Sequence, residues 1–276
     1  MFKIIDELNG EYYAKVKFND ASTVAYFNDG TRLLYGNTYY FKVEKVLWKV
    51  IDSKTSVAIS EYVLDAMPFY DNNQDRTYED PKTNITVKVY PNDFSESTIH
   101  KFLNEGKVNR YSALTEDLKE INYENKGFLT AAFGNSAKAD VNTTFEEISK
   151  YVLYQVSVDN TEESTLAPGN PFSTYYTKGY FYPLSHKEFK QDYAQTLKSG
   201  VAYATDYAIA KEVECTRTDK NEPKAASWWL RSPYHDSSKE ALYVNISGAV
   251  KNTTVTNGKI GLRPACVLIF DEETNE

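Results

Sequence analysis

Ser227-Trp-Trp-Leu-Arg-Ser-Pro233 and Gly261-Leu-Arg-Pro-Ala-Cys266 are the two stretches of sequence that decide the fold of this chain. Both read as short buried strands. Successive side chains of a strand point to opposite faces, so we expect one of Trp228 and Trp229 to enter the core and the other to pack under a loop or helix. The two stretches are therefore predicted to be fold determinants.

Arg231 and Arg263 lie inside these strands, and each is soon followed by a proline that we expect to end strand pairing. A guanidinium group is a rigid fork of donors that suits loop carbonyls or a carboxylate. We predict that both arginines, like the two tryptophans, are structural and hold irregular loops. Contact with a ligand is the alternative.

A polar insert, residues 234–259, separates the two strands. Alternation places Tyr243, Asn245 and Ser247 on one face of a strand, with turns at Gly248 and at Asn257. Such side chains bind through adaptable hydrogen bonds and aromatic stacking. An ordinary solvated hairpin is the alternative interpretation. The predicted ligand-binding residues are Tyr234, His235, Asp236, Tyr243, Asn245, Ser247, Lys251, Asn252, Thr254 and Asn257.

Composition limits the class of protein. The 276 residues are 41% hydrophobic and include 23 tyrosines, which excludes global disorder and favours β structure. A net charge of −8 argues against nucleic acid or an anionic membrane as the main partner. There is no 18-residue apolar run, and the first residues lack a signal core. We expect a cytoplasmic or virion-associated protein, and the oligomeric state stays open.

The order of local signals predicts an α+β fold, with strands at both ends and helices in the middle. Residues 1–37 are expected to form an N-terminal β-hairpin extension, 38–270 a single domain, and 271–276 an acidic tail. The best helix start is the capping box of Ser185 and Glu188. Further expectations are a strand or bent pair of strands over 38–51, a helical turn over 61–66, and helices near 99–103, from Thr115, and over 205–213.

Seven short motifs follow one another along most of the chain, each occurring once. They are Trp48-Lys-Val-Ile51, Val57-Ala-Ile-Ser60 with Leu64-Asp65, Ser97-Thr-Ile-His-Lys-Phe-Leu-Asn104, Phe181-Tyr-Pro-Leu-Ser-His-Lys-Glu188, Thr205-Asp-Tyr-Ala208, Trp228–Pro233 and Gly261–Ala265. Their order resembles an uncharacterised domain family of Gram-positive bacteria and their phages over about residues 38–270. His100, Phe102 and Leu262 stand where that family tends to have Arg, Trp and Val.

That family in turn resembles the C-type-lectin-like fold of the formylglycine-generating-enzyme kind. The resemblance implies a small sheet that holds both a Trp-rich strand and the terminal Gly-Leu-Arg strand. Members of this superfamily include phage receptor-binding proteins, variable proteins diversified by retroelements, oxidases and sulfoxide synthases. The fold therefore leaves the function open.

Catalytic and metal-binding signals are weak. The sequence has no His-Glu-x-x-His, no Gly-x-Ser-x-Gly and no Gly-rich phosphate loop. His100 and His186 are expected in surface or capping roles, and His235 with Asp236 is the best acid/base candidate. Cys215 and Cys266 match no zinc or copper spacing; Cys266 is expected in a buried strand, and a disulfide between the two stays open. We therefore assign no catalytic residue, metal or cofactor.

The predicted function is non-enzymatic recognition of a protein or glycan by a bacterial or phage module. A metal-dependent oxidoreductase of the same fold and a structural virion subunit are the alternatives.

Overall fold

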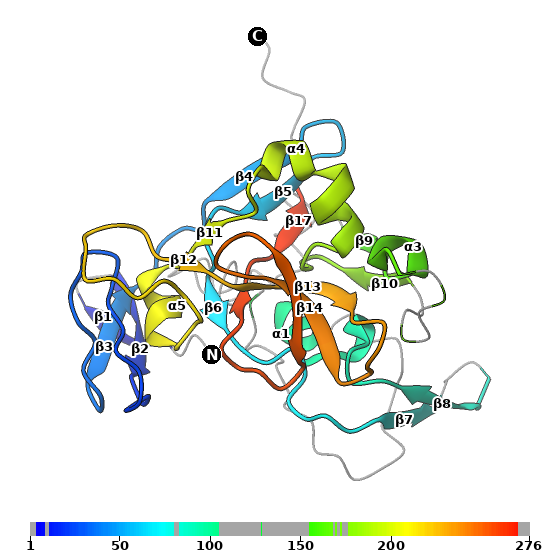
Figure 1. Ribbon diagram of the computed structural model, residues 1–276, viewed down its shortest axis with the longest axis horizontal. Coiled ribbons are helices and arrows are strands. Elements are labelled where there is room, and N and C mark those ends of the chain that lie inside the picture. The colour runs from blue at the N-terminus through cyan, green and yellow to red at the C-terminus, as the bar shows by residue number, and fades with distance from the viewer. Residues whose placement is uncertain are drawn as a thin grey trace.

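The computed structural model describes residues 4–8, 11–79, 83–104, 128, 155–167, 169, 172 and 176–269. It is an α+β fold, built mostly of strands with a few short helices (Figure 1). The helix expected from Thr115 and the acidic tail lie outside the described residues. No helix in the described part of the chain is both long and apolar enough to cross a membrane.

The largest sheet is built around the Trp-Trp strand, in which every residue is buried. Its strand order is β15-β14-β13-β16-β6. The bounds are β13 (Trp228–Pro233), β14 (Glu240–Val244), β15 (Val250–Thr254), β16 (Gly261–Leu262) and β6 (Asp65–Ala66). β13 runs antiparallel to β14 and parallel to β16, where Trp228 lies opposite Gly261. The helical turn predicted over 61–66 is wrong, because Asp65 and Ala66 pair with β16.

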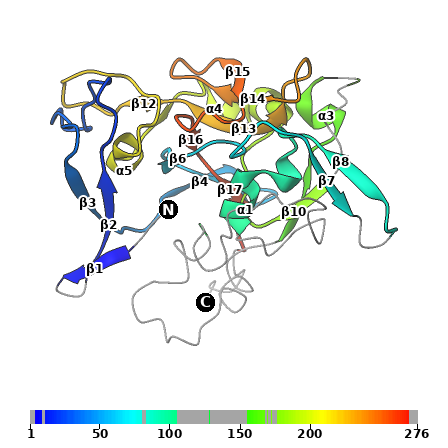
Figure 2. The same ribbon diagram turned by 90° about the horizontal axis from the view of Figure 1, so that it is seen from below.

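Two three-stranded sheets flank this sheet, in the orders β1-β2-β3 and β17-β5-β4. Their bounds are β1 (Ile4–Leu8), β2 (Glu11–Lys17), β3 (Thr38–Lys42), β4 (Trp48–Asp52), β5 (Val57–Ser60) and β17 (Ala265–Val267). The predicted bent pair over 38–51 is confirmed as β3 and β4, which belong to different sheets. Figures 1 and 2 show the N-terminal sheet on one side of the molecule.

The remaining strands form three two-stranded ladders: β7 (Arg76–Glu79) with β8 (Thr86–Val89), β9 (Val156–Asp159) with β10 (Tyr176–Gly179), and β11 (Ala202–Tyr203) with β12 (Ala225–Ala226). The helical segments are η1 (Phe94–Glu96), α1 (Thr98–Asn104), α3 (Glu162–Thr165), η3 (Glu188–Asp192), α4 (Ala194–Leu197) and α5 (Asp206–Ala210). All of them are short, so tertiary packing rather than helix propensity stabilises them.

The predicted capping box is confirmed. The Ser185 backbone N–H donates to Glu188 Oε2 over 2.7 Å, and the Glu188 N–H donates to Ser185 Oγ over 3.1 Å. The helix predicted at 205–213 is also present as α5, and Thr205 Oγ1 caps it by accepting from the Ala208 N–H. The capping box therefore located the start at Ser185 correctly. The second helix starts where it was predicted and ends at Ala210, three residues earlier than expected.

The N-terminal segment departs from a simple hairpin. The turn at Asn28 forms, but only one bridge, Tyr26 to Arg32, flanks it. The continuous pairing is that of β1, β2 and β3, and it crosses the boundary expected at residue 37. Asn28 binds the rest of the chain: its Nδ2 donates to Ala204 O and to Asp206 Oδ1, and its Oδ1 accepts from the Lys224 N–H.

The two tryptophans of β13 pack in different layers. Trp228 meets the Phe189 ring edge to face at 5.5 Å, and its Nε1 donates to Gly200 O over 3.2 Å. Trp229 meets Phe69 at 5.6 Å, and its Nε1 donates to Met67 O over 2.9 Å. Each indole therefore combines full burial with a satisfied donor.

His100 is wholly buried on α1, so its predicted surface or capping role is wrong. Six of the seven residues of α1 are buried, because η1 and β10 pack against the helix. His100 Nε2 lies 3.0 Å from Lys178 O, and Nδ1 is buried without a hydrogen bond in the described part of the chain. Burial lowers the pKa of His100 from its usual 6.5 to about 4.

This burial predicts a stability loss in mild acid. Between pH 6.5 and about 4 the unfolded chain protonates His100 while the folded chain does not, so the free energy of unfolding falls as the pH falls. The full effect is about 3 kcal/mol. We expect His100→Phe to lose less stability than the wild type between pH 7 and pH 4.5 in urea denaturation. Identical pH dependence of the two proteins would contradict the assignment.

The turn between β14 and β15 contains a glycine, Gly248, at a position with no room for a side chain. Gly248 has φ +81°, and a Cβ there would collide with the Ser199 carbonyl oxygen. Gly36 has φ +80° with nothing near its Cβ position, so Gly36→Ala isolates the backbone strain. We expect Gly36→Ala to cost roughly 1 kcal/mol and Gly248→Ala roughly 2–4 kcal/mol in denaturant unfolding. Equal losses would mean that the turn is not held against Ser199.

Candidate functional site

A compact exposed cluster follows the end of β13. Asp236 contacts both of its aromatic neighbours: its Oδ2 accepts from the Tyr234 hydroxyl over 2.8 Å, and its Oδ1 lies 2.9 Å from His235 Nε2. The two rings lie edge to face, with centroids 5.2 Å apart. The hydrogen bond to Asp236 raises the pKa of Tyr234, which keeps the phenol protonated at neutral pH. One carboxylate thus orients both rings.

The loop that carries this cluster is held by hydrogen bonds from the buried side chain of Asn92. Asn92 is wholly buried, and its Nδ2 donates to Ser237 O over 2.8 Å and to Glu240 O over 2.9 Å. The Tyr234 N–H also donates to Glu240 O. All three of these bonds reach main-chain carbonyls, so they do not depend on the side chains of His235 and Asp236. No sequence signal pointed to Asn92, since its partners lie about 145 residues away along the chain.

The strands that follow do not present one uniform face. In the β14–β15 register, Tyr243 lies opposite Lys251, and Leu242 lies opposite Asn252. Directly opposed residues share a face and neighbours alternate, so Tyr243 and Lys251 lie on one side, and Asn252 with Thr254 on the other. Tyr243 packs its ring against Trp229 at 6.2 Å. The predicted binding residues are therefore divided between two faces.

Asn252 belongs with the aromatic cluster. Its Nδ2 donates to Glu240 Oε2 over 2.7 Å, and Thr254 lies directly opposite Glu240. The Tyr234 N–H donates to Glu240 O over 3.0 Å, so the two residues lie next to each other. The structure thus brings together the loop residues 234–236 with Glu240, Asn252 and Thr254, which we call the Tyr234 surface.

Three other predicted residues shape turns instead. Asn245 Oδ1 accepts from the Ser247 N–H, the Ser247 hydroxyl and the Ala249 N–H, so both residues are engaged inside the turn. Asn257 Oδ1 accepts from the Lys259 N–H, and its Nδ2 lies 3.3 Å from Thr253 Oγ1. The strand expected to run on to Ile246 ends at Val244. The continued alternation predicted there is wrong, because Asn245 turns the chain.

Arg231 forms hydrogen bonds with every donor of its side chain. Its Nε and Nη2 donate to Asp159 O, and its Nη1 donates to Pro183 O. Nη1 and Nη2 also bind Glu188 Oε2 and Oε1, over 2.5 and 2.9 Å. All five N–H donors are satisfied at 1% exposure. No donor is left for a ligand, so this arginine joins β13, β9 and the capping box.

Arg263 is also buried and engaged. Its Nε donates to Ser60 O over 3.0 Å, and its guanidinium lies 5.1 Å from the Trp228 ring. Burial lowers its pKa to about 10, which still leaves it charged at neutral pH. It ties the terminal strand to the end of β5.

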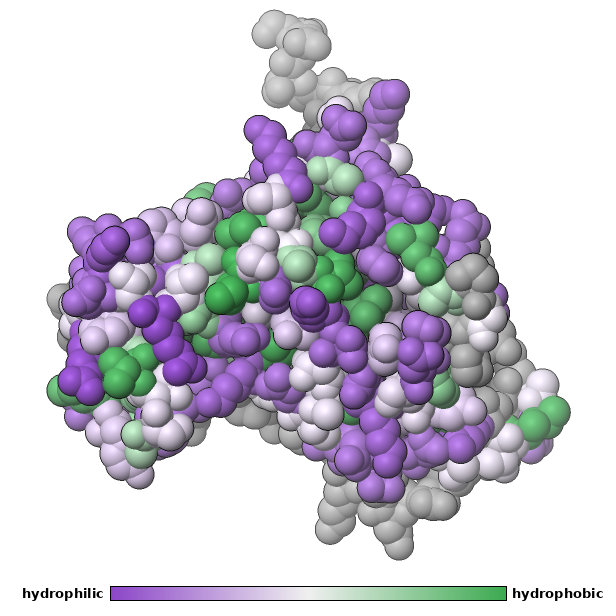
Figure 3. Space-filling view, in the orientation of Figure 1, coloured by the Kyte–Doolittle hydropathy of each residue, from purple (hydrophilic) through white to green (hydrophobic). Residues whose placement is uncertain are grey.

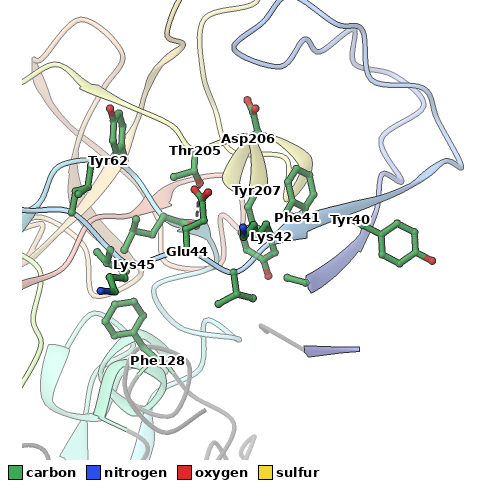
Figure 4. Close-up of a pocket in the computed structure, with 15 residues that line it drawn as sticks. Tyr40, Phe41, Lys42, Glu44, Lys45, Tyr62, Phe128, Thr205, Asp206 and Tyr207 are labelled. Atoms are coloured by element: carbon green, nitrogen blue, oxygen red, sulfur yellow. Dashed lines mark hydrogen bonds between the residues drawn. The ribbon is translucent and has the colours of Figure 1, made fainter. Parts of the chain in front are cut away.

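A cavity of about 480 Å³ lies away from the Tyr234 surface, between β3 and α5 (Figure 4). Much of its wall is the chain that joins β3 to β4, and Tyr62, Phe128 and Tyr207 close it from other elements. Sequence reasoning missed it, because residues 38–51 read only as strand. On the face seen in Figure 3, hydrophobic residues gather in a band across the middle, within hydrophilic surroundings.

Neither the cysteines nor the other possible metal ligands form a metal site among the described residues. Both cysteines are free thiols, and Cys266 is buried in β17 as predicted. Burial raises the pKa of Cys266 to about 12 and that of Cys215 to about 11, so both stay protonated at neutral pH. Within the described ranges, no group of three or more His, Cys, Asp or Glu side chains is placed to hold a metal ion.

The bonding of Arg231 predicts that lysine cannot replace it. Lysine offers three donors from a single point, so Arg231→Lys leaves Glu188 or the Asp159 and Pro183 carbonyls unsatisfied. We expect a loss of about 3–5 kcal/mol in unfolding free energy. The control is Arg217→Lys at an exposed arginine, with a change within about 0.5 kcal/mol. A loss as small as the control's would show that the network adds little.

Comparison with known proteins places the chain in a family. No curated protein and no solved structure matches it significantly. The family model described as a domain of unknown function, DUF6273, matches residues 54–269. The match begins after β4 and includes the Arg231 network, the Tyr234 surface and the terminal strand. The chain therefore belongs to the DUF6273 family.

Proposed function

We propose that this protein is a non-enzymatic recognition module, of bacterial or phage origin, that binds a glycan or a protein through the Tyr234 surface. The observation that carries the proposal is the Asp236 carboxylate, which holds Tyr234 and His235 in a fixed pair at the surface. Rigid, exposed aromatic side chains bind partners at a low cost in conformational entropy. Asn92 adds to this preorganisation by fastening the loop.

The side chains around this pair suit a hydroxyl-rich or amide-rich ligand. Ring faces of Tyr234 and His235 offer stacking surfaces, while Asp236 and Glu240 accept hydrogen bonds and Asn252 both donates and accepts. Asp236 and His235 are 61% and 56% exposed, so a ligand reaches them without rearrangement of the loop. Carbohydrates and polar protein surfaces both provide such donors and rings.

We further propose that the fold is C-type-lectin-like. The pairing of β13 with β16 supports this, because it puts the Trp-Trp strand and the Gly-Leu-Arg strand into one small sheet. In the phage receptor-binding proteins and retroelement-diversified proteins of that superfamily, residues just before the terminal strand contact ligands. Here Asn252 and Thr254 occupy that place in the chain and are exposed.

The proposal is tested by binding to a glycan array and to bacterial surface proteins. We expect Tyr234→Ala/His235→Ala to lose at least tenfold in affinity with unchanged thermal stability. The control is Tyr35→Ala, which removes a tyrosine that is 65% exposed. Asn92→Ala should weaken binding and speed hydrogen exchange in residues 234–240, because the loop loses two fastening bonds.

Three outcomes would contradict this function. Binding that survives the double substitution places the contact elsewhere. Stoichiometric iron or copper in the purified protein would favour a metal-dependent oxidoreductase. A stable homotrimer that binds neither glycan nor protein would favour a structural virion subunit.

A further inference from the structure

The cavity beside α5 lies where the N-terminal sheet meets the part of the chain that the DUF6273 model matches. Two groups of residues line it: 14 and 40–47, which precede the match, and 62, 64, 128 and 205–207, which fall inside it. Ligand sites are often formed at such junctions, and the volume of about 480 Å³ is within their usual range. The cavity is therefore a second candidate binding site, separate from the Tyr234 surface.

Aromatic rings form a main part of its wall. Phe41 of β3 and Tyr207 of α5 meet edge to face, with ring centroids 5.7 Å apart, and Figure 4 shows the two rings close together. Both rings are held in place from the protein side. Phe27 of the core packs against Phe41 at 5.9 Å, and Tyr207 is only 7% exposed on its capped helix. A flat apolar molecule can therefore pack against rings that are already fixed.

Aliphatic side chains supply much of the remaining wall. Val43 and Val46 belong to the chain that joins β3 to β4, and Leu64 lies between β5 and β6. All three are partly exposed in the structure. Covering them would remove apolar surface from water, which favours an apolar occupant.

The charged groups of the wall balance one another. The described lining carries two lysines, Lys42 and Lys45, and two carboxylates, Glu44 and Asp206. Lys42, Glu44 and Lys45 are exposed and therefore stay hydrated. Because neither sign is in excess, a charged ligand would lose its own hydration here without gaining a net opposite charge.

Two polar side chains beside Tyr207 already have partners within the protein. Asp206 Oδ1 accepts from the Asn28 N–H and Nδ2, and Figure 4 shows the Asp206 carboxylate directed away from the Tyr207 ring. Thr205 Oγ1 accepts from the Ala208 N–H and lies 3.3 Å from Val63 O. The start of α5 therefore presents its aromatic side chain to the cavity, while its polar groups stabilise the fold.

We propose that this cavity binds an uncharged, mostly apolar small molecule that contains a planar ring. The ring packs against Phe41 and Tyr207, and the rest of the molecule contacts the aliphatic wall of Val43, Val46 and Leu64. Removal of apolar surface from water supplies the affinity, and the balanced charges disfavour ionic analogues. This inference does not depend on the ligand of the Tyr234 surface.

The test compares three probes that share one ring system: neutral methoxynaphthalene, anionic naphthalene sulfonate and cationic naphthylmethylammonium. Each is titrated into the full chain and followed by naphthalene fluorescence. We expect the neutral probe to bind one site per chain, and both charged probes to bind at least tenfold more weakly. The affinity of the neutral probe should not fall when salt rises from 0.1 to 0.5 M, because no ion pair is screened.

Matched variants locate the site. Val46→Trp fills the cavity and should weaken binding of the neutral probe at least tenfold, whereas Val50→Trp makes the same exchange at a 41% exposed valine outside the lining and should not. Lys45→Glu should leave that affinity within twofold, because the probe carries no charge. Thermal denaturation checks folding, and Val43→Trp replaces Val46→Trp if the latter does not fold.

Several results would overturn the proposal. They are absence of binding by the neutral probe, equal affinity for all three probes, and equal loss in Val46→Trp and Val50→Trp. A dimer that dissociates in Val46→Trp would show instead that a second copy of the chain fills the cavity. Tyr234→Ala/His235→Ala should bind the neutral probe as the wild type does, so failure here and failure of the proposed function are distinguishable.

Discussion

The bonds of Arg231 are the constraint on which the rest of the structure depends. Its position in the central strand is dictated by the buried Trp-Trp-Leu-Arg run, which leaves a charged group 1% exposed. A buried guanidinium persists only where carboxylate and carbonyl partners surround it. Glu188 supplies the carboxylate, and it is available because Ser185 begins a helix there. One charge therefore fixes a strand, a helix start and the end of β9 together.

Much of this frame could be predicted from local sequence. The paired Ser185 and Glu188, the helix that starts at Thr205 and the buried strand at Trp228 all depend on residues a few positions apart, so the sequence alone indicates them. The same alternation rule failed past Val244, because Asn245 accepts three bonds inside its own turn. Hydrogen bonds from a side chain to the nearby backbone can end a strand, and the pattern of hydrophobic residues does not reveal them.

The parts that could not be predicted depend on distant partners. His100 was expected on the surface of a helix. In the structure it is buried, and its ring contacts Lys178 O of β10, 78 residues away in the sequence. Asp65 and Ala66 became strand only because β16 lies beside them. Likewise, Asn252 and Thr254 are part of the Tyr234 surface because β15 pairs with β14, the strand that begins at Glu240. Tyr243 lies on the other face and packs against Trp229. Neither candidate site is contiguous in sequence, and only the pairing register assembles them.

The loop after β13 is held mainly through its own carbonyl groups, which accept hydrogen bonds from Asn92 and from the Tyr234 N–H. Among the side chains of residues 235–239, Ser237 Oγ accepts from the Lys239 N–H, whereas those of His235, Asp236, Ser238 and Lys239 have no hydrogen bond to the loop backbone within the described structure. A lineage, or an engineer, can therefore exchange His235, Asp236, Ser238 and Lys239 while the backbone of the loop keeps its shape. The same property makes this DUF6273 chain a natural framework for a randomised binding library in which the diversity carries little stability cost.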